Sequence, residues 1–115
     1  MYRAVYAEIT EDDPHEARRR EGMAFDRVIA QLDAAQAAAG DSPARASALD
    51  AAGDLWSVLL NDLAHPENAL PEALRAQLIS VGLWIMREIA ALRARATEDF
   101  EPLIAVNQTI RSGLR

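Results

Sequence analysis

Few prolines and glycines interrupt this chain, and they separate long segments that are rich in strong helix formers. Five residues of each type occur, and the prolines stand at positions 14, 43, 66, 71 and 102. Alanine, leucine, arginine and glutamate dominate the segments between them, and these residues have high helix propensity. Nowhere do apolar and polar residues alternate over the length of a strand. The sequence therefore predicts an all-α fold.

Each segment carries apolar residues at steps of three and four, the spacing that gathers them on one face of a helix. Proline near the start and glycine after the end are typical of helix boundaries. These signals predict helices between residues 13 and 40, 41 and 66, 71 and 96, and 100 and 113. The third has the widest apolar face, and we expect it to be the central helix of the fold. Its two adjoining stripes comprise Leu74, Leu78, Val81, Ile85 and Leu92, and Ile79, Leu83, Met86 and Ala90.

The predicted architecture is one small helical bundle. A chain of 115 residues has the size of a single domain. The connections between the predicted helices are short, so neighbouring helices should run antiparallel. Ahead of them lies a short segment around Tyr2 and Tyr6, which we also expect to be helical. We therefore predict a single domain over residues 1–115, built from about four helices and this N-terminal segment.

The charge balance is acidic, with 18 Asp and Glu against 12 basic residues and a formal net charge of -6. All the basic residues are arginines, because the chain contains no lysine. Proteins bind nucleic acid mainly through positive charge that displaces counterions, so direct binding of DNA or RNA is disfavoured. The run Arg18-Arg19-Arg20 lies among acidic residues and is typical of a solvated helix face.

The chain contains no cysteine, which excludes a disulfide framework, a cysteine-ligated zinc site and a thiol nucleophile. Its longest apolar run, Leu78 to Met86, is far shorter than the roughly 20 residues of a membrane span. The start of the chain turns acidic where a secretory signal would place its apolar stretch. We therefore expect a cytoplasmic protein that has no membrane contact.

No constellation of residues points to catalysis. The two histidines, His15 and His65, lie beside prolines at the ends of different predicted helices. Asp62 and His65 have the spacing of one metal-ligand pair, but no second pair accompanies them. Neither a glycine-rich phosphate loop nor a Gly-x-Ser-x-Gly motif occurs. The sequence therefore favours a protein that is not an enzyme and uses no metal or cofactor.

Aromatic and polar residues on apolar helix faces are better candidates for function. Trp56 and Trp84 each lie on a predicted apolar face, where a tryptophan either fills the core or forms the floor of a groove for a partner helix. Asn107 lies on the apolar face of the last helix and needs a hydrogen-bond partner, either inside the domain or on a bound protein. As partner-contacting residues we select aromatic and leucine side chains near helix ends, of which some should prove to be core: Tyr2, Tyr6, Trp56, Leu70, Trp84 and Leu114.

Several stretches of the chain resemble a known family. Three lie between Leu55 and Glu88 and include the block Pro66-Glu67-Asn68-Ala69-Leu70-Pro71, and another covers residues 103–114. Together with the start Tyr2-Arg3-Ala4-Val5-Tyr6, they make the chain similar, over essentially its whole length, to the FlaF family of alphaproteobacterial flagellar biosynthesis regulators. The Glu-Asn-x-Leu-Pro block is the most specific part of this resemblance.

The resemblance implies a cytoplasmic factor that promotes flagellin synthesis and secretion. FlaF-like proteins are regarded as flagellin-binding, chaperone-like factors, similar in role to the unrelated FliS export chaperones. They work opposite FlbT, which is tied to repression through the flagellin message. The family has no known catalytic residues to carry over. Two modes of action stay open: direct binding of flagellin, whose terminal helices would enter an apolar groove, and a contact with FlbT that alters flagellin levels indirectly.

Overall fold

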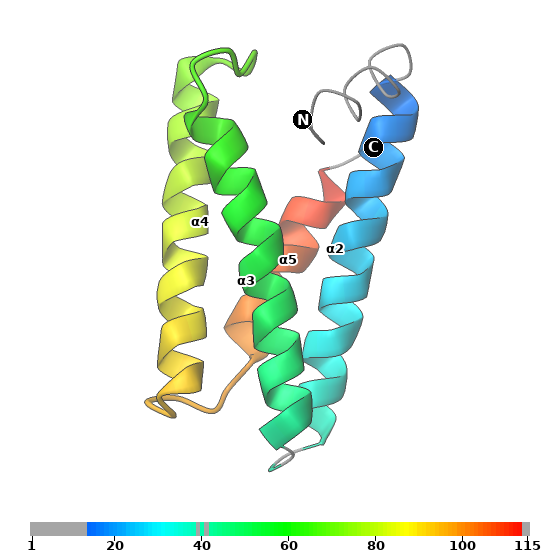
Figure 1. Ribbon diagram of the computed structural model, residues 1–115, viewed down its shortest axis with the longest axis vertical. Helices are drawn as coiled ribbons and strands as arrows, with labels where there is room; N and C mark the ends of the chain where they lie inside the picture. Colours follow the sequence, from blue (N-terminus) through cyan, green and yellow to red (C-terminus); the bar gives the residue numbers. More distant parts are fainter. Residues whose placement is uncertain (1–13, 39, 41, 114–115) are drawn as a thin grey trace.

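The computed structural model describes residues 14–38, 40 and 42–113, and all regular structure in this part of the chain is helical (Figure 1). The prediction of an all-α fold is therefore confirmed. The helices are α2 (Pro14–Ala37), α3 (Ser42–Ala64), α4 (Glu72–Arg93) and α5 (Glu101–Ser112). Each lies within the range that the sequence predicts, and each has a proline in its first turn or immediately before it. Gly40, which follows α2, has a φ of 90°, a left-handed conformation that glycine adopts without strain.

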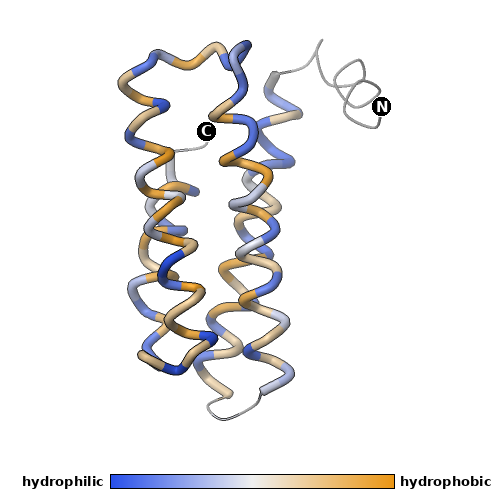
Figure 2. Tube along the Cα trace, turned by 60° about the vertical axis from the view of Figure 1, so that its left-hand side comes forward, coloured by the Kyte–Doolittle hydropathy of each residue, from blue (hydrophilic) through white to orange (hydrophobic). Residues whose placement is uncertain are grey.

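The helices run alternately down and up, so neighbours along the chain are antiparallel (Figure 1). α3 packs against both α2 and α4, and α2 also packs against the shorter α5. The expectation that the third predicted helix is central is therefore wrong, because α3 takes that place and α4 lies at its side. Figure 2 shows hydrophobic residues recurring between hydrophilic ones along the helices, as amphipathic packing requires.

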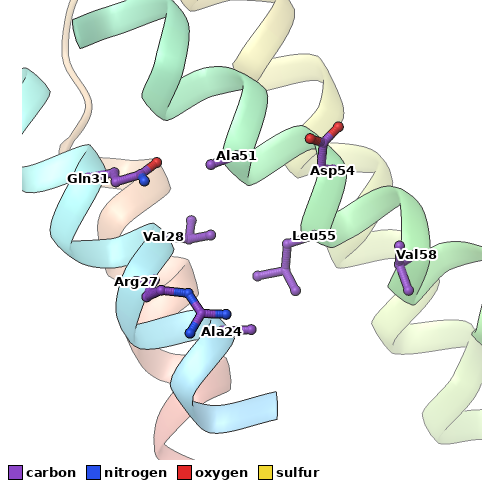
Figure 3. Close-up of a pocket in the computed structure, with 8 residues that line it drawn as sticks. All are labelled: Ala24, Arg27, Val28, Gln31, Ala51, Asp54, Leu55 and Val58. Carbon is purple, nitrogen blue, oxygen red and sulfur yellow. The ribbon is translucent and has the colours of Figure 1, made fainter. Parts of the chain in front are cut away.

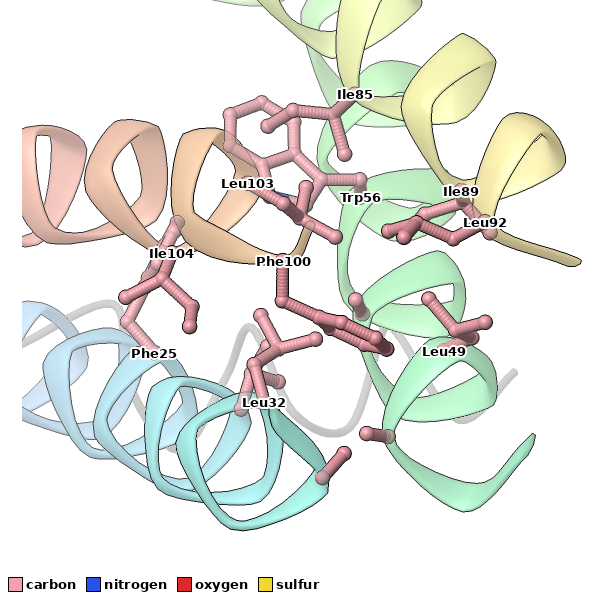
Figure 4. Close-up of a cluster of buried hydrophobic side chains, with 14 residues drawn as sticks. Phe25, Leu32, Leu49, Trp56, Ile85, Ile89, Leu92, Phe100, Leu103 and Ile104 are labelled. Atoms are coloured by element: carbon pink, nitrogen blue, oxygen red, sulfur yellow. The ribbon is translucent and has the colours of Figure 1, made fainter. Parts of the chain in front are cut away.

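Trp56 lies in the middle of the core, and only 1% of its surface is exposed. Its ring meets Phe25 of α2 edge to face, with ring centroids 5.9 Å apart and an interplanar angle of 88°. This is a favourable geometry for two aromatic rings. All four described helices or their immediate flanks contribute to the core around it (Figure 4). The buried apolar residues of this core are Phe25, Val28, Leu32, Ala35, Ala48, Leu49, Ala52, Trp56, Ile85, Ile89, Leu92, Phe100, Leu103 and Ile104.

Asn107 is the polar side chain of this core, and none of its surface is exposed. Its Oδ1 accepts a hydrogen bond of 2.9 Å from the indole Nε1 of Trp56. Its Nδ2 donates to the backbone carbonyl oxygen of Leu103 over 2.8 Å. Both the amide and the indole are thus satisfied without water, which removes most of the cost of burying them. Of the two roles that the sequence left open for Asn107, the internal hydrogen bond is the one found.

Polar side chains tie the helices together at the end where α2 joins α3 and α4 joins α5, which we call the closed end. The buried Arg45, in the first turn of α3, donates to the carbonyl oxygen of Leu92 in the last turn of α4. Its guanidinium also lies over the ring of Phe100, 5.2 Å from the ring centroid. Gln36 of α2 accepts a hydrogen bond of 3.1 Å from the backbone N–H of Phe100. Side chains from α2 and α3 therefore hold the ends of α4 and α5.

The opposite end, which we call the open end, contains the start of α2 and the connection from α3 to α4. Asn68 organises this connection, because its Nδ2 donates to the carbonyl oxygen of Asp62 over 3.0 Å. Its Oδ1 accepts from the backbone N–H of Leu70 over 3.0 Å. Pro71 follows and directly precedes α4. The Glu-Asn-x-Leu-Pro block therefore forms the turn that reverses the chain between α3 and α4.

An ion pair fixes α5 to α2. Arg111 donates through Nε to Oδ1 of Asp26 over 2.9 Å, and through a terminal nitrogen to Oδ2 over 3.3 Å. This hydrogen bonding lowers the pKa of Asp26 below its ordinary value. The guanidinium lies close over Gly22, where a Cβ atom would stand 2.7 Å from its Cζ. The second half of α5 is therefore held against α2.

The negative charge of Glu21 in α2 is unfavourable in the folded state. Partial burial of its carboxylate raises its pKa, and the negative charge of Asp62 on α3 raises it further. Arg18 opposes the shift by attraction. A carboxyl group with a raised pKa in the folded state binds its proton more tightly there than in the unfolded chain. Ionised Glu21 therefore lowers the stability of the fold near neutral pH.

Two helical glycines should respond in opposite ways to substitution by alanine. At Gly82 of α4, a Cβ atom would lie 2.5 Å from Cδ2 of Leu60 and 3.2 Å from Cε3 of Trp56. At Gly53 of α3, the nearest atom would be Cδ1 of Ile89, at 4.0 Å. Because alanine favours a helix by about 1 kcal/mol over glycine, we expect Gly53→Ala to raise the free energy of unfolding by about that amount. We expect Gly82→Ala to lower it, since overpacking costs about 1–3 kcal/mol.

Urea titration followed by circular dichroism measures both changes. The two variants receive the same new methyl group in the same type of secondary structure, so each controls for the other. Equal stabilisation by both substitutions would contradict the close approach of α3 and α4 at Gly82.

Replacement of Glu21 by glutamine should stabilise the protein in a pH-dependent way. At pH 7 the variant lacks the partly desolvated negative charge that Asp62 repels, so we expect a higher midpoint of unfolding than in the original chain. As the pH falls below about 4.5, the original carboxyl group becomes protonated in both states. The advantage of Glu21→Gln should then disappear. Thermal unfolding at a series of pH values tests this, and Glu67→Gln in the exposed α3–α4 connection controls for the change in net charge.

Candidate protein-binding surfaces

A groove lies between α2 and α3 on the surface of the described residues. It encloses about 330 Å³. Val28 of α2 and Leu55 of α3 point toward one another across it (Figure 3). Ala24 and Ala51 leave room beside them because their side chains are small. The complete lining consists of Ala24, Arg27, Val28, Gln31, Ala51, Asp54, Leu55 and Val58.

The composition of this groove is amphipathic. Its apolar lining is accompanied by Arg27 and Gln31 from α2 and by Asp54 from α3. Val58 lies on the α3 side and is 63% exposed, a large fraction for an aliphatic side chain. An apolar floor with a few polar groups around it is the arrangement that receives one face of an amphipathic helix. Both charge signs are present at the groove, so a partner helix with mixed charge could pair with either side.

A second apolar surface lies on α4 at the open end. Leu74, Leu78 and Val81 belong to the same helical stripe as Ile85 and Leu92. Ile85 and Leu92 are fully buried, whereas Val81 and Leu78 are half-buried and Leu74 is 41% exposed. The stripe thus emerges from the core toward the start of α4. We call Leu74, Leu78 and Val81 the open seam.

Leu83 forms an isolated apolar site on another side of α4. It is 49% exposed. At 100° per residue it points about 160° away from the buried Ile85. Single exposed leucines of this kind are common on protein surfaces and carry no functional argument.

The contact residues selected from the sequence do not form one site. Trp56 is a core residue, and it could touch a partner only if the helices separated. Trp84 is half-buried and packs against the edge of the core. Leu70 is 40% exposed in the α3–α4 connection. Tyr2, Tyr6 and Leu114 lie outside the described residues, so their contact role stays a prediction.

The groove between α2 and α3 was missed by the sequence analysis. The predicted contact residues are aromatic and leucine side chains near helix ends. Val28 and Val58 are smaller and lie within helices, so they were not among them. One signal was available, because Val58 lies about 200° around α3 from Trp56 and so falls outside the core-facing stripe. An apolar residue at such a position indicates a second apolar face.

The histidines take part in local contacts. Arg18 donates to Nδ1 of His15 over 3.2 Å on the exposed surface of α2. Nδ1 of His65 accepts a hydrogen bond of 3.1 Å from the backbone N–H of Glu67, within the α3–α4 connection. In the part of the chain that the structure describes, no three His, Cys, Asp or Glu side chains are grouped as metal ligands would be. Across the same residues, no helix combines the length and the apolar character needed to cross a lipid bilayer.

Comparison with known proteins identifies the family. The sequence model of the family described as "Flagellar protein FlaF" matches residues 2–114. No curated protein and no solved structure matches the chain. The match extends over all the described helices and over the N-terminal residues that precede them. The chain therefore belongs to the FlaF family of flagellar proteins.

Proposed function

We propose that this protein promotes flagellin synthesis and secretion by binding flagellin directly, as a chaperone-like factor in the cytoplasm. Membership of the FlaF family supports a role in the flagellar system. The apolar groove between α2 and α3 is the observation that supports direct binding. Flagellin has amphipathic terminal helices that pack together in the filament, and a free monomer must keep them from associating too early.

The groove has the chemistry that such a helix requires. Leu55 and Val28 offer apolar contacts along its floor, and Val58 extends the apolar surface on the α3 side. Burying apolar surface contributes about 25 cal/mol per Å². Arg27 and Asp54 can pair with polar side chains at the edges of the bound helix face. These charged groups would set the register of the helix more than its affinity.

The acidic charge of the chain fits the same role. A net charge of -6 keeps a complex with an aggregation-prone client soluble. The same negative charge disfavours direct binding of the flagellin mRNA. An effect on translation would then pass through a protein partner such as FlbT.

Substitution of Val58 by glutamate should weaken flagellin binding without affecting the fold. Val58 is 63% exposed, so the change should alter the free energy of unfolding by no more than about 0.5 kcal/mol. A charge placed against the apolar face of a bound helix should raise the Kd at least about tenfold, which corresponds to ~1.4 kcal/mol. Isothermal titration calorimetry with purified flagellin, and separately with its terminal peptides, measures this change.

The matched control is Leu83→Glu, which places the same charge at an exposed apolar residue on another helix. We expect flagellin to bind this variant as tightly as the original chain. An equal loss of flagellin affinity in both variants would contradict the groove as the binding site. Binding that occurs only after FlbT is added would contradict direct recognition of flagellin and favour action through FlbT.

A further inference from the structure

The open seam is an inward-facing apolar stripe that none of the described helices covers fully. Its residues continue the stripe of Ile85 and Leu92, which face the centre of the bundle and are fully buried. Toward the start of α4 the same stripe becomes exposed, reaching 41% at Leu74. An apolar stripe that points inward and is nevertheless exposed indicates that one element of the bundle is missing from that end.

The length and direction of α5 explain the gap. α5 has 12 residues, whereas α4 has 22 and α3 has 23. It begins beside the end of α4 and leans toward α2 as it rises (Figure 1). The pair of Arg111 with Asp26 holds its second half against α2. α5 is therefore too short to accompany α4 over its whole length, and the start of α4, where Leu74 and Leu78 lie, extends beyond it.

The sequence ahead of α2 has the pattern of a short amphipathic helix. Tyr2, Val5, Tyr6 and Ile9 follow the spacing i, i+3, i+4 and i+7, which gathers them on one face. The positions opposite this face hold the small residues Ala4 and Ala7. Tyrosine suits a site at the edge of a core, because its ring is apolar and its hydroxyl group can stay in water.

We propose that residues 2–9 of this chain dock on the open seam, placing Tyr2, Val5, Tyr6 and Ile9 against Leu74, Leu78 and Val81, and so complete the bundle. This contact is intramolecular and does not depend on flagellin. It lies on a different surface from the α2–α3 groove, so each can be tested without the other.

The dimensions agree with this arrangement. Eight helical residues measure about 12 Å, and the seven steps from Leu74 to Val81 measure about 10 Å. Residues 10–13 link the segment to α2 and can span up to about 14 Å when extended. α2 and α4 pack mainly against α3 rather than against each other. A segment placed between them would lie one helix spacing of about 8–10 Å from α2, within reach of this link. α2 and α4 both begin at the open end (Figure 1).

The family comparison adds an independent observation. The FlaF match begins at residue 2, so the segment is part of the family's domain rather than an addition to it. A segment that belongs to the domain and carries an apolar face requires a partner surface. The open seam is the inward-facing one that α5 leaves uncovered.

Paramagnetic relaxation in the full-length protein tests the proposed contact. The chain has no cysteine, so Ala7→Cys allows a single nitroxide label on the side of the segment away from its apolar face. We expect the methyl signals of Leu74 and Leu78 to lose most of their intensity, and those of Leu83 and Val58 to lose much less. Equal losses at Leu74 and Leu83 would overturn the proposal.

A mixed sample separates docking within one chain from docking between copies. Nitroxide-labelled chains without isotope are combined with isotope-labelled chains that carry no nitroxide. We expect no broadening at Leu74 in this mixture. Broadening there would assign the seam to a second copy of the chain and overturn the intramolecular contact.

Hydrogen exchange provides a second measurement with a matched pair of variants. Loss of the Tyr6 ring in Tyr6→Ser should expose the seam, so amides of residues 74–81 should exchange roughly tenfold faster. Ala4→Ser, on the opposite face of the segment, should leave these rates unchanged. The chemical shift of the Trp56 indole N–H verifies that the core remains folded in both variants. Equal exchange rates in the two variants would contradict the proposal.

Discussion

The fold depends on the side chain of Trp56, because it joins its own helix to the other three described helices. Trp56 itself belongs to α3, its ring meets Phe25 of α2 edge to face, and its N–H is bonded to Asn107 of α5. Gly82 lets α4 approach the same ring so closely that a Cβ atom there would lie 3.2 Å from Cε3. The large ring supplies apolar area, while its single donor selects one position of α5 along the bundle. Apolar contacts alone would leave that position poorly determined, because α5 is short.

The boundaries of the helices could be predicted from the sequence, but their arrangement could not. Proline and glycine act on the backbone next to them, so Pro14, Pro71 and Gly40 mark helix ends whatever the rest of the chain does. The bond between Trp56 and Asn107 joins residues 51 positions apart, and periodicity within a helix carries no information about such pairs. The wide apolar face of α4 suggested a central helix. The width of an apolar face shows how many residues on it are apolar, and on α4 some of these residues, such as Leu74 and Leu83, stay exposed.

The motif that identified the family has a structural role in this chain. Asn68 bonds to the carbonyl oxygen of Asp62 and to the N–H of Leu70, and so closes the turn that Pro71 ends. A partner-contacting role was assigned to Leu70 from the same block, and its exposure is compatible with one. The contacts of Asn68 and the position of Pro71 nevertheless serve the geometry of the turn. A motif can therefore identify a family without marking the site at which the family acts.

Polar side chains of α2 and α3 fix the closed end of the molecule. At the closed end, Arg45 and Gln36 bind backbone groups of α4 and α5, whose loss would leave buried polar atoms without partners. The surfaces assigned to binding lie elsewhere. The α2–α3 groove lies between helices that Trp56 and Phe25 join in the core, so a partner helix would meet a preformed surface and lose little free energy in ordering it. The open seam lies at the other end of α4, away from the contacts of Arg45 and Gln36, so a segment docked there would add to the core around Trp56 without replacing any of these bonds.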